Sequence, residues 1–325
     1  MEKNLKKSMV SVIITTYGRS IFLENAIKSV LCQTYKDFEV IVVDDNAELP
    51  EIRCQIKSIL QKYPKVKLVL NEKNMGGGLS RNEGIKVAKG ELISFLDDDD
   101  TYFPERLERC VDAYDKQLDK DYVGLIYHQS QSVDVNGRFL CVNSTVLEKK
   151  PLAQLLKESC IAATSQWIVP KRVFFQVGMF EDTPCKQDST MMLKIIGGGF
   201  RVVCVNQVLS NYLVHNQVKI SGNPRRNIDG LLFYRNLARK YYAKLSKFEI
   251  EASERRFAKD LLVNYSAIDD RNSAIIEYRN YSLNNAKFVE ELKGFFIILF
   301  GSFRVSFECI LRSLLHRVKR LIRKN

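Results

Sequence analysis

The sequence has few of the residue patterns that build zinc sites or disulfide frameworks. Its eight cysteines include no pair spaced as Cys-x-x-Cys, and only three histidines are present. A reducing compartment therefore fits these cysteines better than an oxidising one. The sequence also lacks an apolar run of roughly eighteen residues, so no membrane-spanning helix is predicted. The N-terminal "MEKNLKKSMVSVIITTYGRS" has no signal-peptide cleavage site, and we expect a cytoplasmic protein.

Two common nucleotide-binding signatures are missing as well. No GxGxxG follows the first apolar stretch and no GK[ST] occurs, which argues against dinucleotide-dependent dehydrogenases and P-loop enzymes. The glycines at Gly76–Gly78 still fit the start of a helix, where backbone amides can cradle a phosphate.

Positive charge is abundant but unevenly placed. The net charge is +12, and residues 301–325 contain seven Lys and Arg residues against Glu308. A nucleic-acid-binding protein would more often spread its basic residues over a folded face, so we expect no nucleic-acid partner. In this tail, apolar residues recur every three to four positions, which predicts a basic amphipathic helix on an anionic membrane surface. The alternative is that this helix packs on a partner subunit, and a homodimer is one such arrangement.

The first hundred residues alternate between strand and helix patterns. Short β-branched stretches at 10–16, 38–45, 66–70 and 91–96 are separated by segments with helical spacing. This order predicts an α/β fold with a mostly parallel sheet flanked by helices. Ligands bind such sheets beyond the carboxyl ends of the strands, and polar or acidic clusters follow three of these four.

Three regions are predicted along the chain. Residues 1–230 contain the strand and helix patterns of an α/β domain. Residues 231–290 are charged and helical without a strand pattern, which indicates a helical appendage. Residues 291–325 form the amphipathic tail.

Four consecutive aspartates follow the fourth apolar stretch in "ISFLDDDDTYFPERL". In an extended chain, Asp97 and Asp99 would share one side, and Asp98 and Asp100 the other. Two carboxylates on one side could ligate Mg²⁺ or Mn²⁺, which often hold substrate phosphates and would relieve the repulsion between the carboxylates. A solvated acidic loop is the alternative.

Two long segments together resemble the family 2 glycosyltransferases. They are "VSVIITTYGRSIFLENAIKSVLCQTYKDFEVIVVDDN" and "NMGGGLSRNEGIKVAKGELISFLDDDDTYFPERLE", and the resemblance extends more weakly to about residue 220. It implies the GT-A fold, which binds nucleotide-diphosphosugars, and a Mn²⁺ or Mg²⁺ cofactor.

The resemblance also implies donor-binding roles for matching residues. Thr15, Tyr17 and Asp44 match positions that cup the nucleotide base, usually uracil. A carboxylate can accept the N3–H of uracil, and a tyrosine ring offers a stacking face. Arg81 matches a position near the ribose or the phosphates.

Metal-binding roles follow from the same resemblance. Asp97 and Asp99 match the two acidic positions of the DxD motif, with Asp99 as the metal ligand and Asp98 as a further donor contact. His215, in "SNYLVHNQVKIS", matches a position near the diphosphate or the metal. A structural role is the alternative for this histidine.

A catalytic base is implied in the second half of the domain. The segment "VGMFEDTPCKQDSTMMLKI" matches the family pattern that places the catalytic carboxylate at Asp188, with Gln187 in place of a frequent Glu. Glu181 and Asp182 belong to an earlier acidic pair and are assigned a structural role. Without the resemblance, Asp188 would be read as a carboxylate that stabilises a helix start.

Together these features predict an inverting glycosyltransferase. The expected donor is a UDP-sugar and the expected acceptor a lipid-linked glycan or oligosaccharide of bacterial surface polysaccharide synthesis, with the protein peripheral at the inner face of the cell membrane. Two alternatives remain: a non-catalytic nucleotide- or glycan-binding protein with the same fold, and a membrane-surface assembly scaffold.

Overall fold

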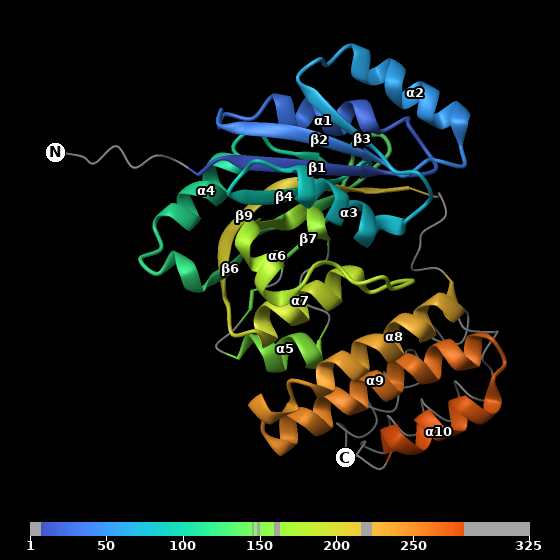
Figure 1. Cartoon of the computed structure of the whole chain (residues 1–325). Helices are drawn as coiled ribbons and strands as arrows, with labels where there is room; N and C mark the ends of the chain where they lie inside the picture. The colour runs from blue at the N-terminus through green and yellow to red at the C-terminus, as the bar shows by residue number, and fades with distance from the viewer. Residues whose placement is uncertain (1–7, 145, 148–149, 159–162, 216–222, 283–325) are drawn as a thin grey trace, which may run out of the picture. The chain divides into compact units, whose positions relative to one another are not determined.

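The computed structural model describes residues 8–144, 146–147, 150–158, 163–215 and 223–282 of the 325-residue chain (Figure 1). Contacts divide the chain into two units, Met1–Val218 and Lys219–Asn325. The sequence-based boundary at residue 230 falls inside a helix of the second unit. The predicted tail, 291–325, lies outside the described residues. Within the described residues, no helix combines the length and apolarity needed to cross a membrane.

The first unit is built on one mixed sheet, in the order β3-β2-β1-β4-β8-β6-β9-β5 with β7 paired to β6. Its N-terminal strands match the four apolar stretches closely: β1 (Val10–Thr16), β2 (Phe38–Asp44), β3 (Val66–Leu70) and β4 (Leu92–Asp97). The later strands are β5 (Thr101–Tyr102), β6 (Val123–Asp134), β7 (Phe139–Asn143), β8 (Trp167–Pro170) and β9 (Arg201–Val214).

The direction of pairing changes along the sheet. Strands β3, β2, β1 and β4 are parallel, as predicted. Strand β8 pairs antiparallel with β4 and β6, and β5 pairs antiparallel with β9, whereas β6 and β9 are parallel. The second half of the unit is therefore mixed. This allows β9 to return to the edge where the parallel strands end.

Helices cover both faces of the N-terminal strands, because β1 is apolar on both faces. Residues of α1, α2 and α4 share a core with Val12 on one face, and α3 packs against Ile13 on the other. The helices of this unit are α1 (Leu23–Leu31), α2 (Pro50–Gln61), α3 (Gly76–Val87), α4 (Arg106–Asp115), α5 (Pro151–Lys157), α6 (Lys171–Val177) and α7 (Gln187–Gly197).

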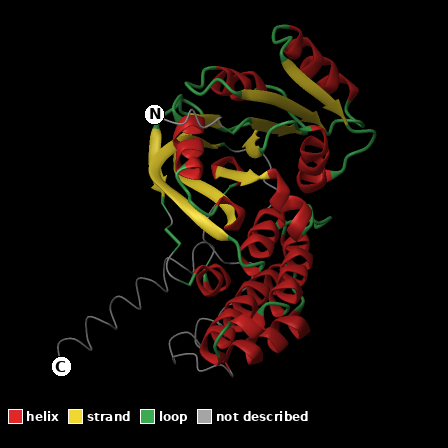
Figure 2. Ribbon diagram, turned by 60° about the vertical axis from the view of Figure 1, so that its left-hand side comes forward, coloured by secondary structure: helices red, strands yellow, loops and turns green. Residues whose placement is uncertain are grey.

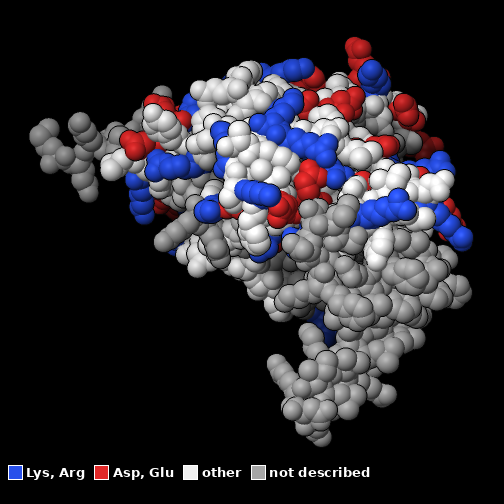
Figure 3. Space-filling view, turned by 90° about the horizontal axis from the view of Figure 1, so that it is seen from below, with Lys and Arg blue, Asp and Glu red and all other residues white. Residues whose placement is uncertain are grey.

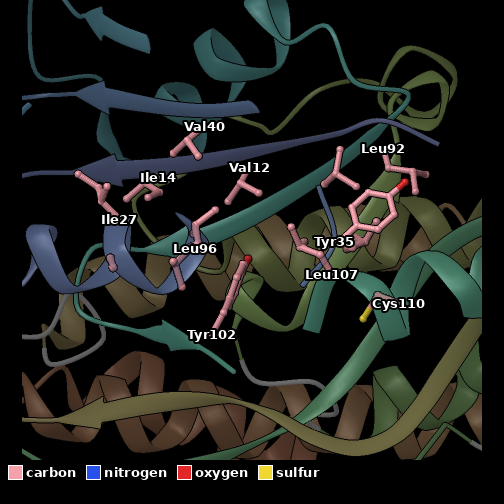
Figure 4. Close-up of a cluster of buried hydrophobic side chains, with 14 of the residues drawn as sticks. Val12, Ile14, Ile27, Tyr35, Val40, Leu92, Leu96, Tyr102, Leu107 and Cys110 are labelled. Carbon is pink, nitrogen blue, oxygen red and sulfur yellow. The ribbon is translucent and has the colours of Figure 1, made fainter. Parts of the chain in front are cut away.

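The core on the Val12 face joins strands and helices that are distant in sequence. Figure 4 shows Val12, Ile14 and Leu96 from the sheet against Ile27 of α1 and Leu107 of α4. All five side chains are at most 1% exposed. Each buried leucine or isoleucine of this kind contributes about 1.5–3 kcal/mol. This packing fixes the strand ends that carry the polar residues.

The described residues of the second unit form helices joined by short connections (Figure 2). It contains α8 (Pro224–Arg239), α9 (Lys247–Ala267) and α10 (Arg271–Ser282). Arg235 of α8 is paired with Glu254 of α9 and Glu277 of α10, so one buried guanidinium joins all three helices. On the face in Figure 3, basic side chains are interspersed with acidic ones.

Candidate active site

The parallel register brings the predicted site residues to one edge of the sheet. Thr16 of β1 lies opposite Asp44 of β2, and Thr15 lies opposite Asp97 of β4. Thr15 is partly buried, whereas the Tyr17 side chain is 48% exposed just beyond the strand. An aromatic face is therefore accessible at the end of β1, where the sequence predicts contact with a base.

Asp44 is fully buried and lies in a network of hydrogen bonds. Its Oδ1 accepts from the backbone and side-chain amides of Asn46, both at 2.8 Å, and its Oδ2 accepts from Arg53 Nε at 3.0 Å. Asn46 in turn accepts from the Gly18 amide at 2.6 Å, next to Tyr17. Asp44 thus anchors the loop that carries Tyr17, and its direct contact with a base stays a prediction.

Asp45 is a helix-capping residue. Its carboxylate accepts from the backbone amides of Met75 and Gly76, each at 2.8 Å, and from the Asn71 side chain at 2.7 Å. An anion at this position is stabilised by the amides and dipole of α3. At Gly76, the idea of a phosphate cradle is therefore wrong, because an internal carboxylate already accepts its amide.

The four aspartates form a turn. Strand β4 ends at Asp97, and the Asp100 amide donates to the Asp97 carbonyl at 3.0 Å. The expectation that Asp98 and Asp99 lie on opposite sides is wrong, because side-chain alternation requires an extended backbone. Both carboxylates contact the same guanidinium, that of Arg19.

Each of these carboxylates has a defined environment. Asp98 is 4% exposed and accepts from Arg19 Nε at 3.1 Å and Nη2 at 2.8 Å. Burial raises the pKa of Asp98 to about 6, although the charge of Arg19 opposes this. Burial also raises the pKa of Asp100 well above its usual range, and Asp100 accepts from the Leu213 amide at 3.2 Å.

Asp99 lies beside His215, although the two residues are 116 positions apart in the sequence. His215 Nε2 is 2.9 Å from Asp99 Oδ2, and the imidazole stacks on Phe22 with ring centroids 5.5 Å apart. The reason is the antiparallel pairing of β5 with β9, in which Thr101 lies opposite Asn211. Residues before Thr101 therefore lie beside residues after Asn211.

The Asp99 carboxylate suits a Mn²⁺ or Mg²⁺ ion in its chemistry, and the His215 imidazole lies beside it. A carboxylate oxygen and an imidazole nitrogen converge within 2.9 Å at the edge of the sheet. The described residues contain no group of three or more His, Cys, Asp or Glu side chains that could hold a metal ion. Such an ion would need further oxygens from water or substrate phosphates, which is how Mg²⁺ is commonly bound.

Arg81 joins the end of β4 to the start of α7. Its Nη2 donates to Asp97 Oδ1 at 2.8 Å, and its Nη1 lies 3.7 Å from Asp188 Oδ1. The Arg81 side chain is 9% exposed and passes over the Phe180 ring, 5.8 Å from the centroid. One guanidinium therefore holds the predicted donor-binding carboxylate and the predicted base in the same site.

The start of α7 positions Asp188. Lys186, which precedes the helix, has a φ of +63°, an uncommon conformation for a residue with a side chain. A Cβ at Gly78 would lie 3.2 Å from the Gln187 side chain, so the glycines of α3 permit this close approach. Burial raises the pKa of Asp188 to about 6, a shift that Arg81 opposes and Asp97 increases.

Glu181 has the structural role that the sequence assigned to it. It accepts from the buried Lys194 at 2.7 Å, and Lys194 also donates to the Met179 carbonyl at 2.7 Å. This pair ties the loop before α7 to the helix itself.

Sequence reasoning missed Arg19 and Ser165. Ser165 Oγ accepts from the Asp97 amide at 3.1 Å and its side chain also bonds Asp100. Nothing in the local sequence marks Ser165. Arg19 could have been found from the sequence, because it is a basic residue three positions after the end of β1, at the same edge of the sheet as the acidic turn.

Comparison with known proteins agrees with this geometry. The sequence model described as glycosyl transferase family 2 matches residues 11–178, more than half of the chain. The chain belongs to glycosyltransferase family 2. This match includes β1 to β4, the acidic turn and Arg81, and it ends before Asp188.

Individual relatives of this family 2 chain are uncharacterized glycosyltransferases. One from Rickettsia bellii is 31% identical over 61% of this chain and 28% of its own length. One from Rickettsia prowazekii is 27% identical over 81% of both chains. The chain thus spans about a third or less of the length of the Rickettsia bellii relative and of one from Rickettsia conorii, and 81% of the Rickettsia prowazekii relative.

Solved structures show that the fold is shared more widely than the sequence. TarS of S. aureus, residues 1–349 in complex with UDP-GlcNAc, has a TM-score of 0.59 at 17% identity, covering 84% of this chain and 90% of that one. The same TarS fragment in complex with UDP has a TM-score of 0.51. The predicted GT-A fold is confirmed.

Proposed function

We propose that this protein is an inverting glycosyltransferase that uses a UDP-sugar donor. The observation that carries the proposal is the position of Asp188, which the Arg81 guanidinium joins to Asp97 at the carboxyl edge of the parallel strands. Ligands of such sheets bind at that edge. The UDP and UDP-GlcNAc complexes of the structural neighbour TarS support this class of donor.

In the proposed reaction, Asp188 takes the proton of an acceptor hydroxyl. The hydroxyl oxygen forms a bond with the anomeric carbon, the bond from that carbon to the diphosphate oxygen breaks, and its electron pair leaves with UDP. A positioned general base of this kind contributes about 10²–10⁴-fold to the rate. Its pKa of about 6 keeps most of Asp188 ionised above neutral pH, as a base requires.

The remaining residues would bind and orient the donor. Tyr17 offers a ring for stacking, and Arg81 offers a buried charge beside Asp97. Asp99 and His215 would hold Mn²⁺ or Mg²⁺, which stabilises the negative charge of the departing diphosphate when it is bound. Arg19 pairs with Asp98 and Asp99, and Arg81 pairs with Asp97, so two guanidinium groups lie at the turn where the diphosphate would bind.

The proposed acceptor is a lipid-linked glycan or an oligosaccharide of surface polysaccharide synthesis, at the cytoplasmic face of the membrane. The basic amphipathic pattern of 291–325 supports peripheral binding to anionic lipid, because each Lys or Arg near such a surface contributes about 1 kcal/mol. The chemistry of the donor site does not depend on this part of the proposal.

The first experiment is a thermal-shift screen of UDP-sugars with and without Mn²⁺, since a ligand that binds only the folded form raises Tm. The second compares two variants in a transfer assay. We expect Asp188→Asn to bind the donor and lose turnover, and Asp99→Asn to lose the Mn²⁺-dependent part of UDP binding. Normal turnover by Asp188→Asn would show that Asp188 is not the base. Binding without turnover by the wild type would favour a non-catalytic binding protein.

A further inference from the structure

Arg19 is the positive charge nearest to the proposed metal ligand. It follows β1, where its carbonyl accepts from Thr16 Oγ1 at 3.1 Å, and its side chain is 23% exposed. The guanidinium donates twice to Asp98 Oδ1 and also contacts Asp99 Oδ2. Because Asp98 is almost fully buried, its two hydrogen bonds fix the orientation of Arg19.

The contact between Arg19 and Asp99 uses the oxygen that a metal ion would need. Asp99 Oδ2 is both the atom that contacts the Arg19 guanidinium and the atom 2.9 Å from His215 Nε2. A cation that binds between Asp99 and His215 must therefore displace this contact. It must also approach a fixed guanidinium charge at short range, where Coulomb repulsion is strong.

Two arginines offset part of the negative charge of the acidic turn without a metal ion. Arg81 is paired with Asp97, and Arg19 with Asp98 and Asp99. The chain itself therefore relieves part of the repulsion between adjacent carboxylates that a metal ion would relieve. A dication gains less from binding such a turn than from binding one with uncompensated charge.

We propose that Arg19 is a resident counter-ion that competes with the divalent cation for Asp99. In the donor-free protein it weakens binding of Mn²⁺ or Mg²⁺. When a nucleoside diphosphate is present, the guanidinium gains another anionic partner, and the cation and the diphosphate bind together. This inference rests on the proposed metal site at Asp99 and His215, and it makes cation binding at that site dependent on the diphosphate.

The test is a Mn²⁺ titration of the full-length protein without donor, in which electron paramagnetic resonance measures the free ion. We expect Arg19→Gln to bind Mn²⁺ at least about tenfold more tightly than the wild type, because a competing positive charge is removed. The matched control is Arg201→Gln, which removes the same charge from an exposed arginine that donates to the Asp119 carbonyl. Asp99→Asn removes the proposed ligand, so the Mn²⁺ binding that this variant loses is the binding at this site.

A second variant covers the case in which Arg19→Gln does not fold. Arg19→Lys keeps the charge but loses the fork that bonds Asp98 twice, so we expect an affinity between those of the wild type and Arg19→Gln. With UDP present, the difference between the wild type and Arg19→Gln should become smaller.

The outcomes separate the two proposals. If the wild type and Arg19→Gln bind Mn²⁺ equally at a site that Asp99→Asn removes, the counter-ion role is overturned and the metal site stands. The counter-ion role is also overturned if Arg19→Gln binds Mn²⁺ more weakly than the wild type does. If Arg19→Gln does not fold, weaker Mn²⁺ binding by Arg19→Lys has the same meaning. If none of the proteins binds Mn²⁺ through Asp99 even with UDP, the proposed metal site fails and the inference fails with it.

Discussion

The salt bridge between Arg81 and Asp188 leads to a prediction about the pH dependence of turnover. Asp188 must be ionised to accept a proton, so kcat is lost as the pH falls through its pKa of about 6. Arg81 Nη1 lies 3.7 Å from Asp188 Oδ1 and favours the ionised form. Replacing Arg81 by Gln removes this charge, and the pH at which activity is lost should rise.

The magnitude follows from the distance and the exposure. Unit charges 3.7 Å apart attract by about 4–5 kcal/mol at an effective dielectric constant of 20. The Asp188 side chain is 34% exposed, so solvent screening reduces this value. We expect the pKa to rise from about 6 to about 7–8, because an adjacent arginine lowers the pKa of an aspartate by about 1–3 and this effect is lost. At pH 6.5 kcat should then fall about 3–25-fold, with recovery near pH 9.

The assay is kcat against pH at saturating donor, because Arg81 is also a predicted donor contact and its loss would raise KM separately. Arg81→Lys keeps the charge and serves as the matched control. We expect its kcat to fall at nearly the same acidic pH as that of the wild type. Thermal unfolding confirms that both variants are folded. An Arg81→Gln profile whose acidic limb stays near pH 6 would refute the reasoning, and so would an unchanged limb in Asp188→Asn.

Three further predictions concern other parts of the chain. Tyr17→Ala should raise KM for the UDP-sugar about 5–150-fold, since stacking of a base on an aromatic ring contributes about 1–3 kcal/mol, whereas Tyr17→Phe should stay near the wild type. Gly84→Ala should reduce the free energy of unfolding by about 1–3 kcal/mol in urea titrations, because its Cβ would lie 2.5 Å from Ile13 Cγ2. Deleting residues 291–325 should abolish flotation with anionic vesicles, and the flotation of the full chain should weaken at high salt; salt-independent flotation would contradict the electrostatic account.

Much of the fold could be predicted from the sequence. Strands β1 to β4 were evident because buried parallel strands need short β-branched stretches, and a helix start at Asp188 agrees with its place in the first turn of α7. The place of the site followed as well, since the carboxyl ends of neighbouring parallel strands meet at one edge. Thr15, Tyr17, Asp44 and Asp97 could be grouped on that basis.

The tertiary structure alone decided which charges meet. Asp98 and Asp99 share Arg19 because the chain turns after Asp97. A run of four aspartates does not indicate such a turn. Pairing of β5 with β9, distant in sequence, placed His215 at Asp99, and the approach of α7 to α3 placed Asp188 at Arg81. The physical reason is that the pattern of apolar residues encodes local conformation and burial, whereas charge partners are set by long-range packing.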